Sequence, residues 1–254
     1  MKMLDLFSGI GGISLAADWA GIETAAFCEI EPFNQKVLNR HWPTVPIFPD
    51  IRTLTKQSLE ESGVDVGTIS IVAGGYPCQP FSVAGDRKGE EDDRHLWPEV
   101  FRLLQEIRPT WFIGENVAGH VTLGLDNVLT DLESIGYTSQ PFVVPACAIG
   151  APHRRDRVFI ISFFSDSNSI GYKGPQQLRK DVSEVEKWRT SSFGTTSKLF
   201  DDIDWEKRAF QSGFLGRDDG IPNRVDRIRS LGNAVVPQQI YPIFEAIAKI
   251  EGLV

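Results

Sequence analysis

The chain has 254 residues, 41% of them hydrophobic and 24% charged, which predicts one large globular domain or one domain with a small insert. No apolar run approaches the roughly 20 residues of a membrane span, and the chain starts directly in a strand-like pattern, so we expect neither a membrane protein nor a signal peptide. The net charge of −8 speaks against a nucleic-acid partner, but the mildly basic second half permits a local phosphate-binding face.

Three cysteines, Cys28, Cys78 and Cys147, lie far apart in the chain and form no CxxC pair. This spacing argues against a metal site and against a disulfide framework, and it indicates a reducing compartment. We therefore expect a cytoplasmic protein without a metal site.

Short apolar runs alternate with amphipathic stretches over the first 160 residues, which is typical of an α/β fold with a mostly parallel, Rossmann-like sheet and helices on both faces. The strands are expected within residues 2–7, 23–30, 64–75, 110–117, 138–146 and 155–164. The helices are expected within residues 11–21, 32–42, 96–109 and 125–136.

The pattern changes at residue 165. Residues 165–222 are polar but hold several aromatic side chains, which favours a small folded insert over a disordered linker. Residues 223–254 are expected to complete the domain formed by residues 1–164, with a loop that leads into a long helix. That helix carries an apolar stripe at three- and four-residue spacing, which predicts burial on the main sheet: Ile240, Ile243, Phe244, Ile247 and Ile250.

A glycine-rich turn, "DLFSGIGG", joins the first strand to the first helix and contains Gly9, Gly11 and Gly12. Glycines allow the backbone to approach a ligand at the positive end of the following helix. Glu29 ends the second strand, where an acid can bind ribose hydroxyls, and Asp50 is suited to meet an adenine amino group. Both NAD and S-adenosylmethionine fit this spacing, but the missing third glycine of the dinucleotide pattern favours S-adenosylmethionine.

A second candidate site is the stretch "GGYPCQPFS", in which Cys78 lies between prolines and cannot belong to a regular helix or strand. It is either a cysteine in a turn or an exposed nucleophile. Glu115, at the end of its strand, is either a surface acid or a partner of Cys78 at the same sheet edge. Arg155 and Arg157 are expected to alternate outward on a strand, as a solvated basic face or as active-site groups.

Five segments, "DLFSGIGG", "PCQPFS", "GENV", "PHRRDR" and "GNAVVP", occur in this order, and together they resemble the DNA cytosine carbon-5 methyltransferases of bacterial and phage type. The resemblance implies a class I methyltransferase fold, with a target-recognition region at 165–222. It also implies Cys78 as nucleophile and Glu115 as the acid that grips the base. Arg155 and Arg157 are the implied paired arginines, which would fix Glu115 and the base carbonyl and help hold the backbone phosphate. His153 stands where such families usually have glutamine. The implied S-adenosylmethionine site comprises Phe7, Gly9, Ile10, Gly11, Gly12, Glu29, Ile30, Asp50, Ile51, Pro77 and Asn233.

The chemistry agrees with these residue types. Thiolate addition at carbon 6 of cytosine makes carbon 5 nucleophilic, and a carboxyl group can share the proton at ring nitrogen 3. The target base must leave the duplex, so double-stranded DNA is the expected partner. The chain is expected to be a monomer, with a cognate restriction endonuclease as a further candidate partner. The alternatives are a tRNA cytosine methyltransferase, a catalytically inactive DNA-binding accessory and a nicotinamide-dependent dehydrogenase.

Overall fold

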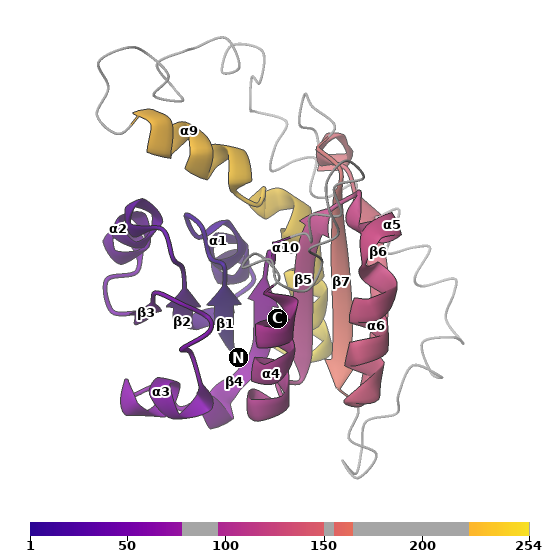
Figure 1. The fold of residues 1–254 in the computed structure, drawn as a ribbon, viewed down its shortest axis with the longest axis horizontal. Helices are drawn as coiled ribbons and strands as arrows, with labels where there is room; N and C mark the ends of the chain where they lie inside the picture. Colours follow the sequence, from indigo (N-terminus) through magenta and orange to yellow (C-terminus); the bar gives the residue numbers. More distant parts are fainter. Residues whose placement is uncertain (78–95, 150–154, 165–223, 254) are drawn as a thin grey trace, which may run out of the picture.

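A computed structural model describes residues 1–77, 96–149, 155–164 and 224–253. In this part of the chain, seven strands form one sheet in the order β3-β2-β1-β4-β5-β7-β6 (Figure 1). Only β7 runs against its neighbours, because it pairs antiparallel with both β5 and β6. The strands are β1 (Lys2–Leu6), β2 (Glu23–Cys28), β3 (Ile47–Phe48), β4 (Ile69–Gly74), β5 (Trp111–Val117), β6 (Tyr137–Val144) and β7 (Arg157–Phe164).

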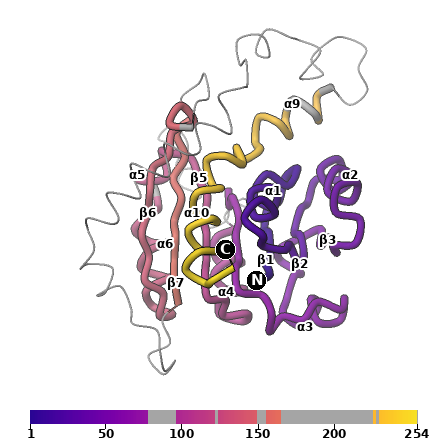
Figure 2. Tube along the Cα trace, turned by 180° about the vertical axis from the view of Figure 1, so that it is seen from behind, coloured from indigo at the N-terminus to yellow at the C-terminus, as the bar shows by residue number. Residues whose placement is uncertain are grey.

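Helices cover both faces of the sheet, as the sequence predicted. In Figure 1, α4 and α6 lie in front of the sheet, and Figure 2 shows α1 and α10 on the opposite face. The helices are α1 (Gly12–Trp19), α2 (Pro32–His41), α3 (Lys56–Glu61), α4 (Trp97–Ile107), α5 (His120–Leu123), α6 (Leu125–Ser134), α9 (Arg224–Asn233) and α10 (Pro237–Ile250). Two 3₁₀ turns are η1 (Val66–Thr68) and η2 (Ala146–Ile149).

The expected strands and helices of the first 164 residues are confirmed, with ends that differ by a few residues. The sequence did not predict the short elements β3, α3 and α5. The expectation of a loop before the last helix was wrong, because residues 224–233 form α9. The segment "RVDRIRSLGN" mixes charged residues with a glycine near its end and has no continuous apolar stripe, so hydrophobic periodicity gave no signal for it.

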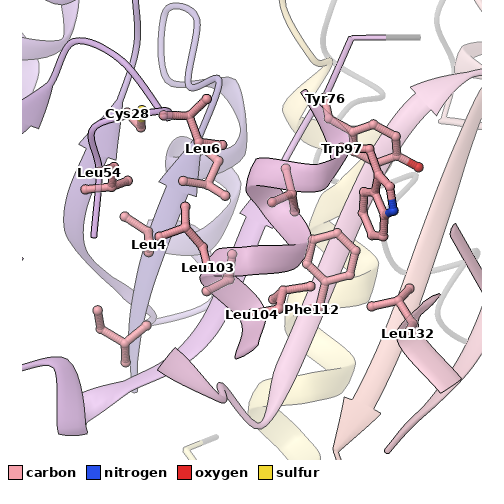
Figure 3. Packing of buried hydrophobic residues seen from close by; sticks show 14 of the residues in the cluster. Leu4, Leu6, Cys28, Leu54, Tyr76, Trp97, Leu103, Leu104, Phe112 and Leu132 are labelled. Atoms are coloured by element: carbon pink, nitrogen blue, oxygen red, sulfur yellow. The ribbon is translucent and has the colours of Figure 1, made fainter. Parts of the chain in front are cut away.

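One hydrophobic core lies between the sheet and helices α3, α4 and α6 (Figure 3). Successive side chains of a strand point to opposite faces, so Leu4 and Leu6 of β1 enter this core while Met3 enters the other. Leu103 and Leu104 of α4 are fully buried within it. The core therefore fixes α4 against the centre of the sheet.

The second core joins α10 to β1 and α1. Ile240 and Phe244 are fully buried, Ile247 almost so, and Ile243 packs against them partly buried. Ile250 was expected in the same stripe, but its side chain is 49% exposed because it is the last residue of the helix. Helix α10 therefore packs into the same core as β1 and α1, as its apolar stripe predicted.

The order of the strands along the chain reverses between β1 and β4, and the candidate site lies at this point of the sheet. From β1 the chain moves outward to β2 and β3, whereas β4, which pairs with β1 on its other side, leads to β5. In open α/β sheets such a switch point leaves a crevice at the carboxyl ends of the strands. Helix α9 lies beyond this end of the sheet (Figures 1 and 2). None of the described helices is long and apolar enough to span a membrane.

Candidate active site

The turn after β1 has the backbone conformation that its glycines predicted. Gly9 and Gly11 have φ values of 55° and 85°, in the left-handed region where glycine pays no side-chain penalty. Phe7 also has a positive φ of 53°, which is uncommon for a residue with a side chain. Ser8 fixes the turn, since its hydroxyl donates to the Asp5 carbonyl at 2.7 Å.

The remaining glycines of the turn serve packing. A Cβ on Gly11 would lie 2.6 Å from the ring of Trp42, and a Cβ on Gly12 would lie 2.5 Å from the Val235 carbonyl oxygen. A cavity lies beside this turn, and Gly11, Gly12 and Ile10 are not among its lining residues. Gly12 instead allows the segment before α10 to approach the start of α1.

A cavity of about 540 Å³ opens beside the turn, within the range of small-molecule sites. Eight residues of the expected cofactor set line it: Phe7, Gly9, Glu29, Ile30, Asp50, Ile51, Pro77 and Asn233. Its other lining residues are Cys28, Glu31, Phe33, Asn34, Pro49, Arg52, Gly75, Leu96, Asp226, Arg229 and Ser230. The structure thus brings together residues from both ends of the chain.

Glu29 is buried, lines this cavity and directly follows β2. One carboxylate oxygen accepts the Gly9 amide hydrogen and the other accepts that of Glu31, both at 2.7 Å. A carboxylate offers about four acceptor positions, so each oxygen keeps capacity for a ligand hydroxyl. Glu29 therefore shapes the glycine turn as well as presenting acceptors to the cavity.

Helix α9 supplies one wall of the cavity, which the sequence did not reveal. Asp226, Arg229 and Ser230 line it from one face of the helix. The Ser230 hydroxyl donates to the Asn34 side-chain oxygen at 2.6 Å, and Arg229 lies 3.1 Å from a carboxylate oxygen of Glu31. These polar contacts join α9 to the segment that begins α2, across nearly the whole length of the chain.

Glu115 lies within β5 and forms a buried ion pair with Arg157, whose Nε is 2.7 Å from Oε1 of Glu115. Burial raises the pKa of the Glu115 carboxyl above its ordinary value, although the charges of Arg157 and Arg155 act against the shift. A carboxyl group with a raised pKa can hold a proton closer to neutral pH. The sequence pointed to Glu115 and to both arginines as its partners, and the structure places Arg157 against it.

Gly75 connects this carboxyl to the segment that carries Cys78. A Cβ on Gly75 would lie 2.8 Å from Oε2 of Glu115, so the backbone after β4 passes directly against the carboxylate. Cys78 follows three residues later and lies outside the described residues. The structure therefore brings the chain just before Cys78 to Glu115.

Arg155 departs from the expectation of two arginines alternating on a strand. β7 begins only at Arg157, and Arg155 precedes it with a left-handed φ of 33°. Its Nη2 donates to the carbonyl oxygens of Gly232 and Ala234, at 2.9 and 2.7 Å. The two arginines thus contact different partners.

A buried polar pair supports the start of the Pro77-Cys78 segment and was missed from the sequence. The Tyr76 hydroxyl and Nε2 of His120 lie 2.9 Å apart, and both residues are buried. The Asn116 side-chain amide donates to the Tyr76 carbonyl at 3.1 Å. The end of β5 and helix α5 therefore hold the segment after β4 by hydrogen bonds.

Asp5 is a further buried acid that the sequence did not single out. Its carboxylate accepts the Ser14 hydroxyl at 2.7 Å, and its second oxygen has no hydrogen-bond partner among the described residues. Burial raises the pKa of Asp5 to about 7; the Ser14 hydrogen bond opposes this shift and the charge of Glu29 adds to it.

We expect Asp5 to make folding stability depend on pH. Its pKa in the folded protein lies above the ordinary value of 3.8, so between about pH 4 and 7 the folded state binds more protons than the unfolded state. The free energy of unfolding should fall as pH rises through this window, by at most about 1.4 kcal/mol per pH unit from this group. In urea denaturation at several pH values, Asp5→Asn should remove this fall, whereas Glu133→Gln, at an exposed position, should not. An unaltered profile for Asp5→Asn would contradict the assignment.

The fold and the site define an α/β protein with a ligand cavity at the switch point of its sheet, beside a buried, arginine-paired acid. The family model of C-5 cytosine-specific DNA methylases matches residues 1–219, and the chain belongs to this family. This result confirms the predicted family, and the matched residues contain four of the five segments, all except "GNAVVP" at 232–237.

Individual relatives agree with the family model. The chain is 34% identical over 180 residues to the type II methyltransferase M2.BsuMI of Bacillus subtilis, an alignment that covers 67% of this chain and 44% of the relative. It is 30% identical over 265 residues to M.HgiBI of Herpetosiphon aurantiacus, covering 96% of this chain and 57% of the relative. The chain therefore spans about half the length of these relatives.

A solved structure gives the same fold. A mutant of DNMT2 from Spodoptera frugiperda superposes with a TM-score of 0.55 at 23% identity, covering 68% of this chain and 52% of the other. The expected class I methyltransferase fold is thereby confirmed for the described residues. The expected insert at 165–222 lies outside them.

Proposed function

We propose that this chain is a DNA cytosine carbon-5 methyltransferase that flips a cytosine out of duplex DNA and methylates it through a covalent Cys78 adduct. The observation that carries the proposal is the buried Glu115–Arg157 pair against Gly75, three residues before Cys78. Gly75 also lines the cavity, so the acid, the cysteine segment and a ligand cavity meet at one sheet edge. Membership of the family supports the same reaction class.

The residues around the cavity fit S-adenosylmethionine. Ile30 is 63% exposed and lines the cavity with Phe7 and Ile51, which offers apolar surface to an adenine ring. Glu29 offers carboxylate acceptors to ribose hydroxyls, and Asp50 offers one to an adenine amino group. Bound there, S-adenosylmethionine would supply the methyl group.

In the proposed mechanism, the Cys78 thiolate adds to carbon 6 of the flipped cytosine. Glu115, held by Arg157, donates a proton to ring nitrogen 3, so that the electrons reach carbon 5 without leaving charge on the ring. Carbon 5 then takes the methyl group, and a base takes the proton from carbon 5. The electrons of that C–H bond restore the ring double bond and expel the Cys78 thiolate, and nitrogen 3 returns its proton to Glu115.

We propose the division into a catalytic part, 1–164 and 223–254, and a target-recognition part, 165–222, whose basic residues contact phosphates. The proposal includes that the protein is a monomer in the cytoplasm and that a cognate restriction endonuclease is a candidate partner.

The deciding experiment offers duplex DNA and tRNA in parallel with labelled S-adenosylmethionine. Labelled duplex DNA supports the proposal, label in tRNA alone supports the tRNA enzyme, and no label in either supports an inactive accessory. Bisulfite sequencing of DNA from cells that express the chain would then give the methylated sequence.

Glu29→Ala is expected to weaken S-adenosylmethionine binding by roughly 1–3 kcal/mol, because ribose hydroxyls and the Gly9 amide lose their acceptor. The choice of DNA sequence should stay the same. Titration calorimetry measures the affinity, and Glu23→Ala, at the exposed other end of β2, is the matched control. Unchanged affinity in Glu29→Ala would mean that the ribose is held elsewhere.

A further inference from the structure

Arg155 and Arg157, the second and third arginines of "PHRRDR", divide their contacts between the two halves of the site. Arg157 contacts the Glu115 carboxylate at 2.7 Å. Arg155 directs Nη2 to two main-chain carbonyl oxygens, those of Gly232 and Ala234. These carbonyls flank Asn233, which lines the ligand cavity. A guanidinium nitrogen with two hydrogens can bind two acceptors at once, so Arg155 fixes the main chain on both sides of Asn233.

The backbone of Arg155 is tied to the same segment. Nε2 of Gln239, a buried residue of α10, donates to the Arg155 carbonyl at 3.1 Å and to the Val144 carbonyl at 2.8 Å. The left-handed φ of 33° at Arg155 is strained for a residue with a Cβ, and such conformations persist where the surroundings hold them. Side chain and main chain of Arg155 are therefore both anchored to residues 232–239.

The opposite side of this segment is packed against the glycine turn. The Val235 carbonyl occupies the space that a Cβ on Gly12 would need. Ser230, one turn before Asn233, is bonded to Asn34. Residues 232–235 thus lie between Arg155 on one side and the start of α1 on the other, and a shift at Arg155 would displace Asn233.

We propose that Arg155 is a positioning residue for the cofactor, which fixes Asn233 in the cavity wall. The inference rests on the proposed function, because it takes the cavity as the S-adenosylmethionine site. Since Arg157 follows two residues later and holds Glu115, one short segment aligns the cofactor wall with the catalytic acid.

The test compares Arg155→Ala, Arg155→Lys and Arg157→Ala in the full chain, by calorimetric titration with S-adenosylmethionine and by steady-state kinetics. Arg155→Ala should raise both Kd and KM for S-adenosylmethionine by about 10- to 100-fold, the loss expected for hydrogen bonds from a charged group, while KM for duplex DNA changes less than about threefold. Guanidinium chloride at millimolar concentration should restore part of the affinity of Arg155→Ala. Arg157→Ala should show the opposite, with low kcat and near-normal cofactor affinity.

A double-mutant cycle with Asn233→Ala separates positioning from general damage. If Arg155 acts through Asn233, Arg155→Ala should weaken cofactor binding much less in the Asn233→Ala background than in wild type. Additive losses would overturn the inference, as would a larger effect on KM for DNA than on KM for the cofactor. If Arg155→Ala does not fold, Arg155→Lys carries the same cycle. A wild-type chain that binds no S-adenosylmethionine would refute the proposed function itself, a result distinct from binding that is insensitive to Arg155.

Discussion

Cys78→Ser is expected to abolish methyl transfer while leaving the affinity for S-adenosylmethionine nearly unchanged. A hydroxyl group is far less ionised than a thiol at neutral pH, so it cannot add to carbon 6 at a useful rate. By analogy with other enzymes that lose a nucleophile, turnover should fall on the order of a thousandfold or more. The measurements are methyl incorporation into duplex DNA and calorimetric titration with the cofactor.

The chain offers a matched control for this substitution. Cys147 is an exposed free cysteine in η2, outside the cavity, and Cys147→Ser should keep wild-type turnover. Cys28 is unsuitable, because it lines the cavity. Substantial turnover by Cys78→Ser would refute the nucleophile assignment.

Trapping tests the same assignment without a mutation. In DNA with 5-fluorocytosine at the target, fluorine replaces the proton that must leave carbon 5, so the final elimination is blocked. The wild-type chain should then form an adduct that survives a denaturing gel, and Cys78→Ser should form none. Absence of an adduct with wild type would count against the covalent mechanism.

A chain ending at residue 223 is expected to lose both the cofactor cavity and the stability of the domain. Removal of α9 takes away Asp226, Arg229, Ser230 and Asn233 from the cavity wall. Removal of α10 uncovers a core face that buries Ile240, Phe244 and Ile247. Each such side chain contributes roughly 1.5–3 kcal/mol on burial, so their sum is comparable to the net stability of a domain. Thermal melts with and without S-adenosylmethionine measure both losses.

Two comparisons sharpen this prediction. Phe244→Ala should destabilise the protein by about 3–5 kcal/mol, whereas Ile250→Ala, on the half-exposed end of the same helix, should cost well under 1 kcal/mol.

A chain in which a short glycine linker replaces residues 168–215 should still fold and bind the cofactor but no longer select DNA sites. If that chain unfolds while the one ending at 223 stays folded and binds the cofactor, the proposed division into two parts is wrong.

The sequence by itself determined six of the seven strands of the sheet, most of the helices and the local parts of the site. Apolar residues repeat with the period of a strand or a helix whenever one face is buried, so the elements around β1, β2, β4 and β5 could be read directly. The turn at Gly9 and Gly11 follows from local backbone sterics, and Glu29 from its place at a strand end. Glu115 was found in the segment "GENV"; it was expected at the end of its strand, but β5 continues to Val117.

Only the tertiary structure decided which side chains meet across long distances in the chain. The sequence contained Ser230 and Asn34, Arg155 and Gly232, and Gly12 and Val235, but no feature of it linked the members of these pairs. Helix α9 was missed for this reason. Polar contacts to the start of α2 hold this helix in place of a periodic apolar stripe, and only such a stripe would have been visible in the sequence. A hydrogen bond or a close backbone contact depends on one residue at one position, so it produces no periodic pattern in the sequence. Burial of a whole face of a helix or strand does produce such a pattern.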